Sequence, residues 1–260
     1  MNTMKELQAL KKTFIFFLLA TFFSMLLCRA SIYFNLDHRI NVLAYSLGIP
    51  VSILILGGFK SISFENIRKS KKWLILATIV PLIYTAALYL LGKYVINFTP
   101  DTLNQDYSIL YASVMILISA FFEEIGWRGY LYKNLTREGW FKMNLIISVL
   151  WATWHLPAIF YGGYAVPSPY WVSMGLFFIN LTLASFVLGW IRQKTGGVLA
   201  PTLIHASNNI GMVITAISGP IIGETGILLT FLLVAFIITT KAWRPTGFFE
   251  LQVLKEKYIG

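Results

Sequence analysis

The stretch Phe121-Phe122-Glu123-Glu124-Ile125-Gly126-Trp127-Arg128-Gly129-Tyr130 puts two adjacent carboxylates and an arginine into hydrophobic sequence. It lies in an apolar run from about residue 108 to 132, and a helix needs about 20 such residues to cross a bilayer. An ionisable side chain in hydrocarbon costs at least about 2.5 to 3.5 kcal/mol. We therefore expect other spanning segments to bring polar partners to Glu123, Glu124 and Arg128.

The composition of the chain is that of a membrane protein. Of its 260 residues 57% are hydrophobic and 12% are charged, and the mean hydropathy is +0.69, whereas a soluble domain has about 25% charged residues. The single cysteine, Cys28, excludes an intrachain disulfide and a cysteine-based zinc site. The formal charge of +10 comes from basic residues scattered between apolar runs, so no nucleic-acid partner is predicted.

Eight hydrophobic runs predict an all-α polytopic membrane protein with eight transmembrane helices. The runs are about 13–27, 40–59, 73–91, 108–132, 143–160, 170–191, 198–217 and 221–239. No repeat or soluble segment separates from this pattern, so residues 1–260 are predicted to form a single membrane domain whose first span is not cleaved. The last two runs are separated only by Ser218-Gly219-Pro220, which leaves seven helices as the alternative count.

The basic residues predict the orientation in the membrane. If the N-terminus is cytoplasmic, the outer segments contain only Arg29, Arg39 and Lys93, and the other 18 of the 21 basic residues lie in inner segments or tails. Cytoplasmic loops of membrane proteins carry an excess of Lys and Arg. Both termini are therefore predicted to be cytoplasmic, in a protein of the plasma membrane.

Two histidines are expected at the depth of the carboxylates. With a rise of about 1.5 Å per residue, His155 lies about 18 Å, His205 about 12 Å and Glu123 about 15 Å from the cytoplasmic ends of their helices. The last value requires the helix to continue past Arg128 to Tyr132. Ionisable groups at one depth in separate membrane helices are expected to face one another and to form a functional site.

Helical spacing separates the two carboxylates. Glu124 and Arg128 are four residues apart with the acid first, which favours an ion pair. That pair makes an arginine tolerable at this depth. Glu123 lies about 100° further round the helix and is the candidate for chemistry. His205 and Asn209 share one helix face by the same four-residue spacing.

Three further residues have mainly structural interpretations. Asn208, three residues after His205, remains an alternative to Asn209 as the amide that serves the site, and either amide can simply join two helices. Trp151 and Trp154 are expected to lie in the core or in the aromatic belt rather than to take part in chemistry.

A carboxylate, two imidazoles and an amide suit the activation of water for attack on a carbonyl group. The carboxylate acts as general base, and imidazole and amide donors, or a metal that they hold, stabilise the oxyanion. The sequence contains no His-Glu-x-x-His, Gly-x-Ser-x-Gly, Walker or Gly-x-Gly-x-x-Gly motif. Serine and nucleotide chemistry are therefore not predicted.

Three short motifs follow one another on separate runs. They are Glu-Glu-x-x-x-Arg at Glu123, Glu124 and Arg128, aromatic-x-x-x-His at Trp151 to His155, and His-x-x-x-Asn at His205 to Asn209. In this order they resemble the CPBP (CAAX protease and bacteriocin-processing, or Abi) family of intramembrane endopeptidases, which includes the Ras-converting type of CAAX prenyl protease. The resemblance covers residues 107–217 and implies an eight-helix fold whose site opens toward the cytoplasm. Trp151 is a departure, because the family usually has Phe there.

The resemblance implies that Glu123 is the base that activates water. The residues that would assist it are Glu124, Arg128, His155, His205 and Asn209. Their implied roles are to orient the water, to stabilise the oxyanion or to bind a metal. The two histidines, with Glu123 or Glu124, can supply the three protein ligands of a zinc site, so the implied protease is either glutamate-based or metal-dependent.

The implied function is hydrolysis of a peptide bond in a membrane-associated peptide or a prenylated, CAAX-like protein. The expected partners are membrane lipid and that substrate. A non-catalytic membrane scaffold or bacteriocin-immunity protein is the alternative, in which the polar residues serve the fold. A proton-coupled transporter is a third interpretation, and the lack of an inverted repeat in the sequence speaks against it.

Overall fold

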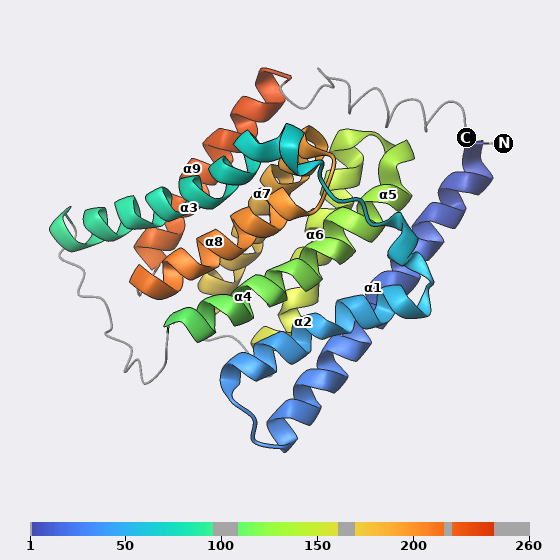
Figure 1. Ribbon diagram of the computed structural model, residues 1–260, viewed down its shortest axis with the longest axis horizontal. Helices are drawn as coiled ribbons and strands as arrows, with labels where there is room; N and C mark the ends of the chain where they lie inside the picture. Colours follow the sequence, from blue (N-terminus) through green and yellow to red (C-terminus); the bar gives the residue numbers. More distant parts are fainter. Residues whose placement is uncertain (1, 96–108, 161–169, 216–219, 242–260) are drawn as a thin grey trace.

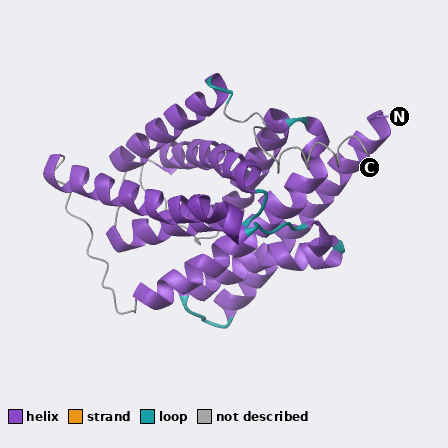
Figure 2. Cartoon of the chain, turned by 45° about the horizontal axis from the view of Figure 1, so that its top comes forward, coloured by secondary structure: helices purple, strands orange, loops and turns teal. Residues whose placement is uncertain are grey.

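The computed structural model describes residues 2–95, 109–160, 170–215 and 220–241. Within these ranges the chain forms helices joined by short loops, and they contain no strand (Figure 2). The all-α prediction is therefore confirmed. Arg244, Lys255 and Lys257 of the C-terminal tail, which contribute to the predicted orientation, lie outside the described residues.

Each predicted hydrophobic run falls on a helix. Within the described ranges, the long helices are α1 (Asn2–Tyr33), α2 (His38–Ile55), α3 (Ile67–Val95), α4 (Ile109–Glu124), α6 (Trp140–Phe160), α7 (Tyr170–Thr195), α8 (Leu199–Thr215) and α9 (Pro220–Thr239). The short segments are the 3-10 helices η1 (Gly58–Ser61) and η3 (Thr136–Glu138), the π-helix η2 (Ile125–Leu131) and the one-turn helix α5 (Tyr132–Leu135).

In the part of the chain that the structure describes, five helical stretches are long and apolar enough to cross a membrane. They are 6–33, 70–91, 110–138, 140–160 and 171–195, and 40–55 and 230–239 are shorter apolar helices. The chain is thus a polytopic integral membrane protein. The count of eight spans and the cytoplasmic position of both termini stay predictions.

The long helices pack so that α4 lies between α2 and α8. α1 packs against α2, α2 against α4, and α4 against α8, which also packs against α3 (Figure 1). α7 packs against α6, α8 and α9. The helix that carries the two adjacent carboxylates therefore has α2 on one side and α8 on the other.

The helix of the charged residues continues past Arg128, as predicted, but changes its form. α4 ends at Glu124, and the chain runs on as the π-helix η2, all seven of whose residues are buried. The backbone carbonyl of Arg128 accepts a hydrogen bond from Nε of Arg192 on α7 at 2.9 Å. A π-turn alters the backbone pairing of a helix and is frequent at functional sites, and here a buried side chain from α7 supplies a donor to it.

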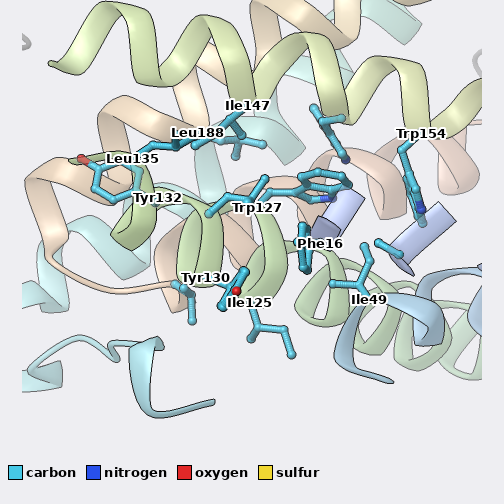
Figure 3. Close-up of a cluster of buried hydrophobic side chains, with 14 of the residues drawn as sticks. Phe16, Ile49, Ile125, Trp127, Tyr130, Tyr132, Leu135, Ile147, Trp154 and Leu188 are labelled. Carbon is cyan, nitrogen blue, oxygen red and sulfur yellow. The ribbon is translucent and has the colours of Figure 1, made fainter. Parts of the chain in front are cut away.

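The hydrophobic core surrounds η2 (Figure 3). Trp127 has no exposed surface, and its ring lies edge-on to Phe16 at 5.6 Å and to Trp154 at 5.9 Å between centroids. A Cβ atom at Gly126 would clash with the side chain of Ile49. The glycine therefore lets η2 approach α2 closely, as small residues do between membrane helices.

Candidate active site

Five of the six predicted site residues lie together in the interior. α4 and η2 contribute Glu123, Glu124 and Arg128, α6 contributes His155, and α8 contributes His205. We call these five residues the carboxylate cluster. Glu124 and Arg128 have no exposed surface, and Glu123 and His155 are 5% and 4% exposed. The direct packing of α4 on α8 and of η2 on α6 brings the three parts of the cluster together.

Glu124 is the anionic centre of the carboxylate cluster. Its Oε1 accepts hydrogen bonds from Nη1 of Arg128 and from Nδ1 of His205, each at 3.0 Å. Nη2 of Arg128 donates to the hydroxyl of Ser185 on α7 at 2.8 Å. The predicted ion pair of Glu124 with Arg128 is confirmed. The bond from His205 to Glu124 was not predicted, and neither was the contribution of Ser185.

Glu123 has a different set of neighbours. Its Oε2 accepts a hydrogen bond from Nε1 of Trp151 at 2.8 Å and lies 3.9 Å from Nε2 of His155. The second distance is too long for a hydrogen bond, but one water molecule can reach both atoms. A water between Glu123 and His155 would be within hydrogen-bond distance of both side chains.

The tautomer of His155 follows from its backbone contact. Nδ1 lies 2.8 Å from the carbonyl oxygen of Trp151, and because a carbonyl only accepts hydrogen bonds, Nδ1 carries a proton. In the neutral ring Nε2 is then an acceptor, like the carboxylate that it faces. A water placed between these two atoms, 3.9 Å apart, would donate a hydrogen bond to each.

Trp151 lies in the buried core, as predicted, and its side chain also contacts the carboxylate cluster. Besides its bond to Glu123, its ring lies 4.5 Å from the guanidinium carbon of Arg128, a cation–π contact. The rings of His155 and His205 lie edge to face with the Trp151 ring, with 5.4 and 5.5 Å between ring centroids. Trp151 thus touches residues from all three motifs.

The amides of α8 are not bonded to the carboxylate cluster. Nδ2 of Asn208 lies 3.4 Å from Oδ1 of Asn209 and 3.6 Å from Sδ of Met212. Over the described ranges, no hydrogen bond joins Asn209 to a residue of the carboxylate cluster. A role for Asn209 stays a prediction, with Asn208 as its alternative.

Glu65 fixes the start of the helix that carries His205. Its carboxylate accepts hydrogen bonds from the backbone N–H groups of Leu199 and Ala200 at 2.7 and 2.8 Å and from the hydroxyl of Thr195 at 3.1 Å. The first N–H groups of a helix have no partner within it, and a negative charge there is favourable. This buried acid, which the hydropathy pattern places in a loop, therefore holds α8 in position.

The zinc interpretation requires three ligands that converge. Both histidines use Nδ1 for a carbonyl or carboxylate contact, as metal-binding histidines commonly do. However, the part of the chain that the structure describes has no group of three or more His, Cys, Asp or Glu side chains arranged to hold a metal ion. The arrangement does not fit a three-ligand zinc site, so we derive no step through a metal, and zinc binding stays a prediction.

Comparison with known proteins agrees with the three motifs. Residues 105–211 match the family described as Type II CAAX prenyl endopeptidase Rce1-like. We call this matched stretch the Rce1-like region. The Rce1-like region contains all six predicted site residues, together with Trp151 and Ser185.

One curated relative of the Rce1-like region is CAAX prenyl protease 2 from Methanococcus maripaludis. It is 30% identical over 131 residues, which are 48% of this chain and 47% of the relative. The chain thus matches about half the length of that protein. The activity and substrate of the whole chain are accordingly proposals.

Proposed function

We propose that this protein is an intramembrane endopeptidase that hydrolyses a peptide bond with a glutamate-activated water. The observation that carries the proposal is the 3.9 Å separation between Oε2 of Glu123 and Nε2 of His155 in a buried site. The adjacent carboxylate of Glu124 is engaged by Arg128 and His205. Glu123 is therefore the carboxylate available as a base.

In the proposed reaction, Glu123 takes a proton from water as the water oxygen bonds to the carbonyl carbon of the peptide. His155 orients the same water through Nε2. The addition gives a tetrahedral intermediate whose former carbonyl oxygen is negative. Collapse of this intermediate breaks the C–N bond, and the proton held by Glu123 passes to the leaving amine.

His205 is the proposed donor to the oxyanion. Its Nδ1 is bonded to Glu124, which fixes the plane of the ring and leaves Nε2 at the opposite edge. When the ring carries both protons, Nε2–H donates to the oxyanion, and Glu124 balances the charge of the ring. Arg128, held by Glu124 and Ser185, positions this network, and Asn209 on the same helix as His205 is a proposed second donor.

The proposed substrate is a membrane-associated peptide or a lipidated protein such as one with a prenylated, CAAX-like C-terminus. The likeness to a CAAX prenyl protease and the position of the site among apolar helices support this substrate class. The distribution of basic residues supports a plasma-membrane protein with eight spans and cytoplasmic termini. In that orientation the substrate reaches the site from the cytoplasmic side.

Cleavage of a farnesylated CAAX peptide and of its unmodified counterpart by the purified full-length protein tests the proposal. Glu123→Gln is expected to lower kcat/KM by about a hundredfold to ten-thousandfold, the usual contribution of a general base. Glu6→Gln removes an exposed carboxylate of α1 and is expected to keep the wild-type rate. A full rate in Glu123→Gln overturns the proposal, and no cleavage by the wild type favours the scaffold or immunity interpretation.

A further inference from the structure

Trp151 holds both of the groups that enclose the water position. Its indole N–H donates to Oε2 of Glu123 at 2.8 Å, and its backbone carbonyl accepts from Nδ1 of His155 at 2.8 Å. Over the described residues, this indole is the one hydrogen-bond donor to the Glu123 carboxylate. One residue of α6 therefore contacts both Glu123 and His155.

The indole ring is itself held from several sides. The guanidinium of Arg128 lies 4.5 Å from its centroid, and Arg128 is bonded in turn to Glu124 and Ser185. Trp151 is 2% exposed, so the ring has little freedom to move. A buried ring in such contacts presents its N–H in one direction only.

We propose that Trp151 is a positioning residue that sets the orientation of the Glu123 carboxylate toward His155 and the water between them. The inference rests on the proposed function. Phenylalanine keeps the aromatic face that Arg128 and the histidines contact but has no N–H group. A chain with phenylalanine at this position would therefore keep the packing and lose the restraint on the base.

Trp154 provides a matched control on the same helix. It is also buried, and its indole N–H also makes one hydrogen bond, to Oγ of Ser24 at 3.1 Å. That bond joins α6 to α1 and involves neither carboxylate. Trp151→Phe and Trp154→Phe thus each remove one buried indole hydrogen bond from α6, and only the first removes it from Glu123.

The kinetic test compares wild type, Glu123→Gln, Trp151→Phe and Trp154→Phe on the same farnesylated peptide. A further variant carries β-(3-benzothienyl)alanine at position 151, in which sulfur replaces the indole N–H with nearly the same shape. Losing a hydrogen bond to a charged group is expected to lower kcat by about tenfold or more in both position-151 variants. KM is expected to stay within about twofold, because the contact is to the base rather than to the substrate.

An NMR experiment detects the contact between Trp151 and Glu123 in the absence of substrate. In protein labelled with ¹⁵N at its eight tryptophans, the indole signal lost in Trp151→Phe identifies Trp151. That signal is expected to move in Glu123→Gln, because an amide oxygen is a weaker acceptor than a carboxylate, and to stay in Glu6→Gln. If the chemical shift of the Trp151 indole is unchanged in Glu123→Gln, the hydrogen bond between the two residues is absent and the inference is overturned.

The outcomes separate this inference from the proposed function. If wild type cleaves the peptide and Glu123→Gln does not, while both position-151 variants keep the wild-type kcat, only the positioning role of Trp151 is overturned. If wild type cleaves nothing, the proposed function fails and the positioning role fails with it. An equal fall of kcat in Trp154→Phe assigns the effect to general packing and also overturns the inference.

Discussion

Nδ1 of His205 lies 3.0 Å from Oε1 of Glu124, the same oxygen that accepts the hydrogen bond of Arg128. Glu124 therefore ties α8 to η2. Glu123, the preceding residue, makes its contacts with α6 instead. Two adjacent carboxylates thus face different helices, which separates the residue that holds the network from the residue that is proposed to act on water.

Loss of the Glu124 charge is expected to destabilise the protein. Glu124→Gln leaves Arg128 buried without its anion, and breaking such a buried pair costs about 3 to 5 kcal/mol. Adding Arg128→Met removes the orphaned charge and is expected to recover part of that loss. Thermal unfolding of the two single variants and the double variant in one detergent measures the coupling. If the double variant loses as much stability as the two single variants together, Glu124 and Arg128 are not coupled.

The two nitrogens of His155 are expected to have separable roles. Asparagine places an N–H donor close to the position of imidazole Nδ1, so His155→Asn keeps the bond to the Trp151 carbonyl and removes Nε2. We expect a melting temperature near that of the wild type and a fall in kcat/KM of about a hundredfold or more. His155→Ala is expected to lose stability as well as activity. Wild-type activity in a folded His155→Asn protein argues against His155 as the group that orients water.

The pairing of Glu124 with Arg128 could be predicted because it depends only on spacing within one helix. The approach of His155 and His205 to the carboxylates could be predicted from depth, since all three segments cross the same hydrophobic layer. The carboxylate that each histidine contacts could not be predicted. Whether His205 meets Glu123 or Glu124 depends on the rotation of α8 about its own axis, which packing determines.

The role of Trp151 and the π-helix gave no local signal in the sequence. A buried tryptophan four residues before a histidine is compatible with packing alone, and only the contact of α6 with η2 turns its N–H toward Glu123. Glu65 is similar, because the N–H group of Leu199 that it caps is 134 residues away along the chain. Contacts of this kind follow from tertiary packing.

Metal content tests the glutamate-based mechanism against the zinc interpretation. Because no three-ligand group is present among the described residues, we expect substoichiometric zinc in the wild type, the same content in His155→Ala, and peptidase activity that survives treatment with a chelator. Elemental analysis measures the zinc content, and the peptide assay measures activity with and without the chelator. Stoichiometric zinc that is lost in His155→Ala, together with inactivation by the chelator, would establish the metal-dependent mechanism instead.

Glu65 is expected to stabilise the fold through the start of α8. Glu65→Ala removes the acceptor of two backbone N–H groups and one hydroxyl. We therefore expect the free energy of unfolding to fall by about 2 to 3 kcal/mol. Thr195→Val removes the hydroxyl contact to this carboxylate, together with the contact of the same hydroxyl to the carbonyl oxygen of Ile191, and is expected to lower the free energy of unfolding by about 1 kcal/mol. Because α8 carries His205, Glu65→Ala is also expected to lower kcat in the fraction that stays folded. Thermal unfolding and the peptide assay measure both effects, and a Glu65→Ala protein as stable as Thr195→Val would show that the carboxylate does not cap α8.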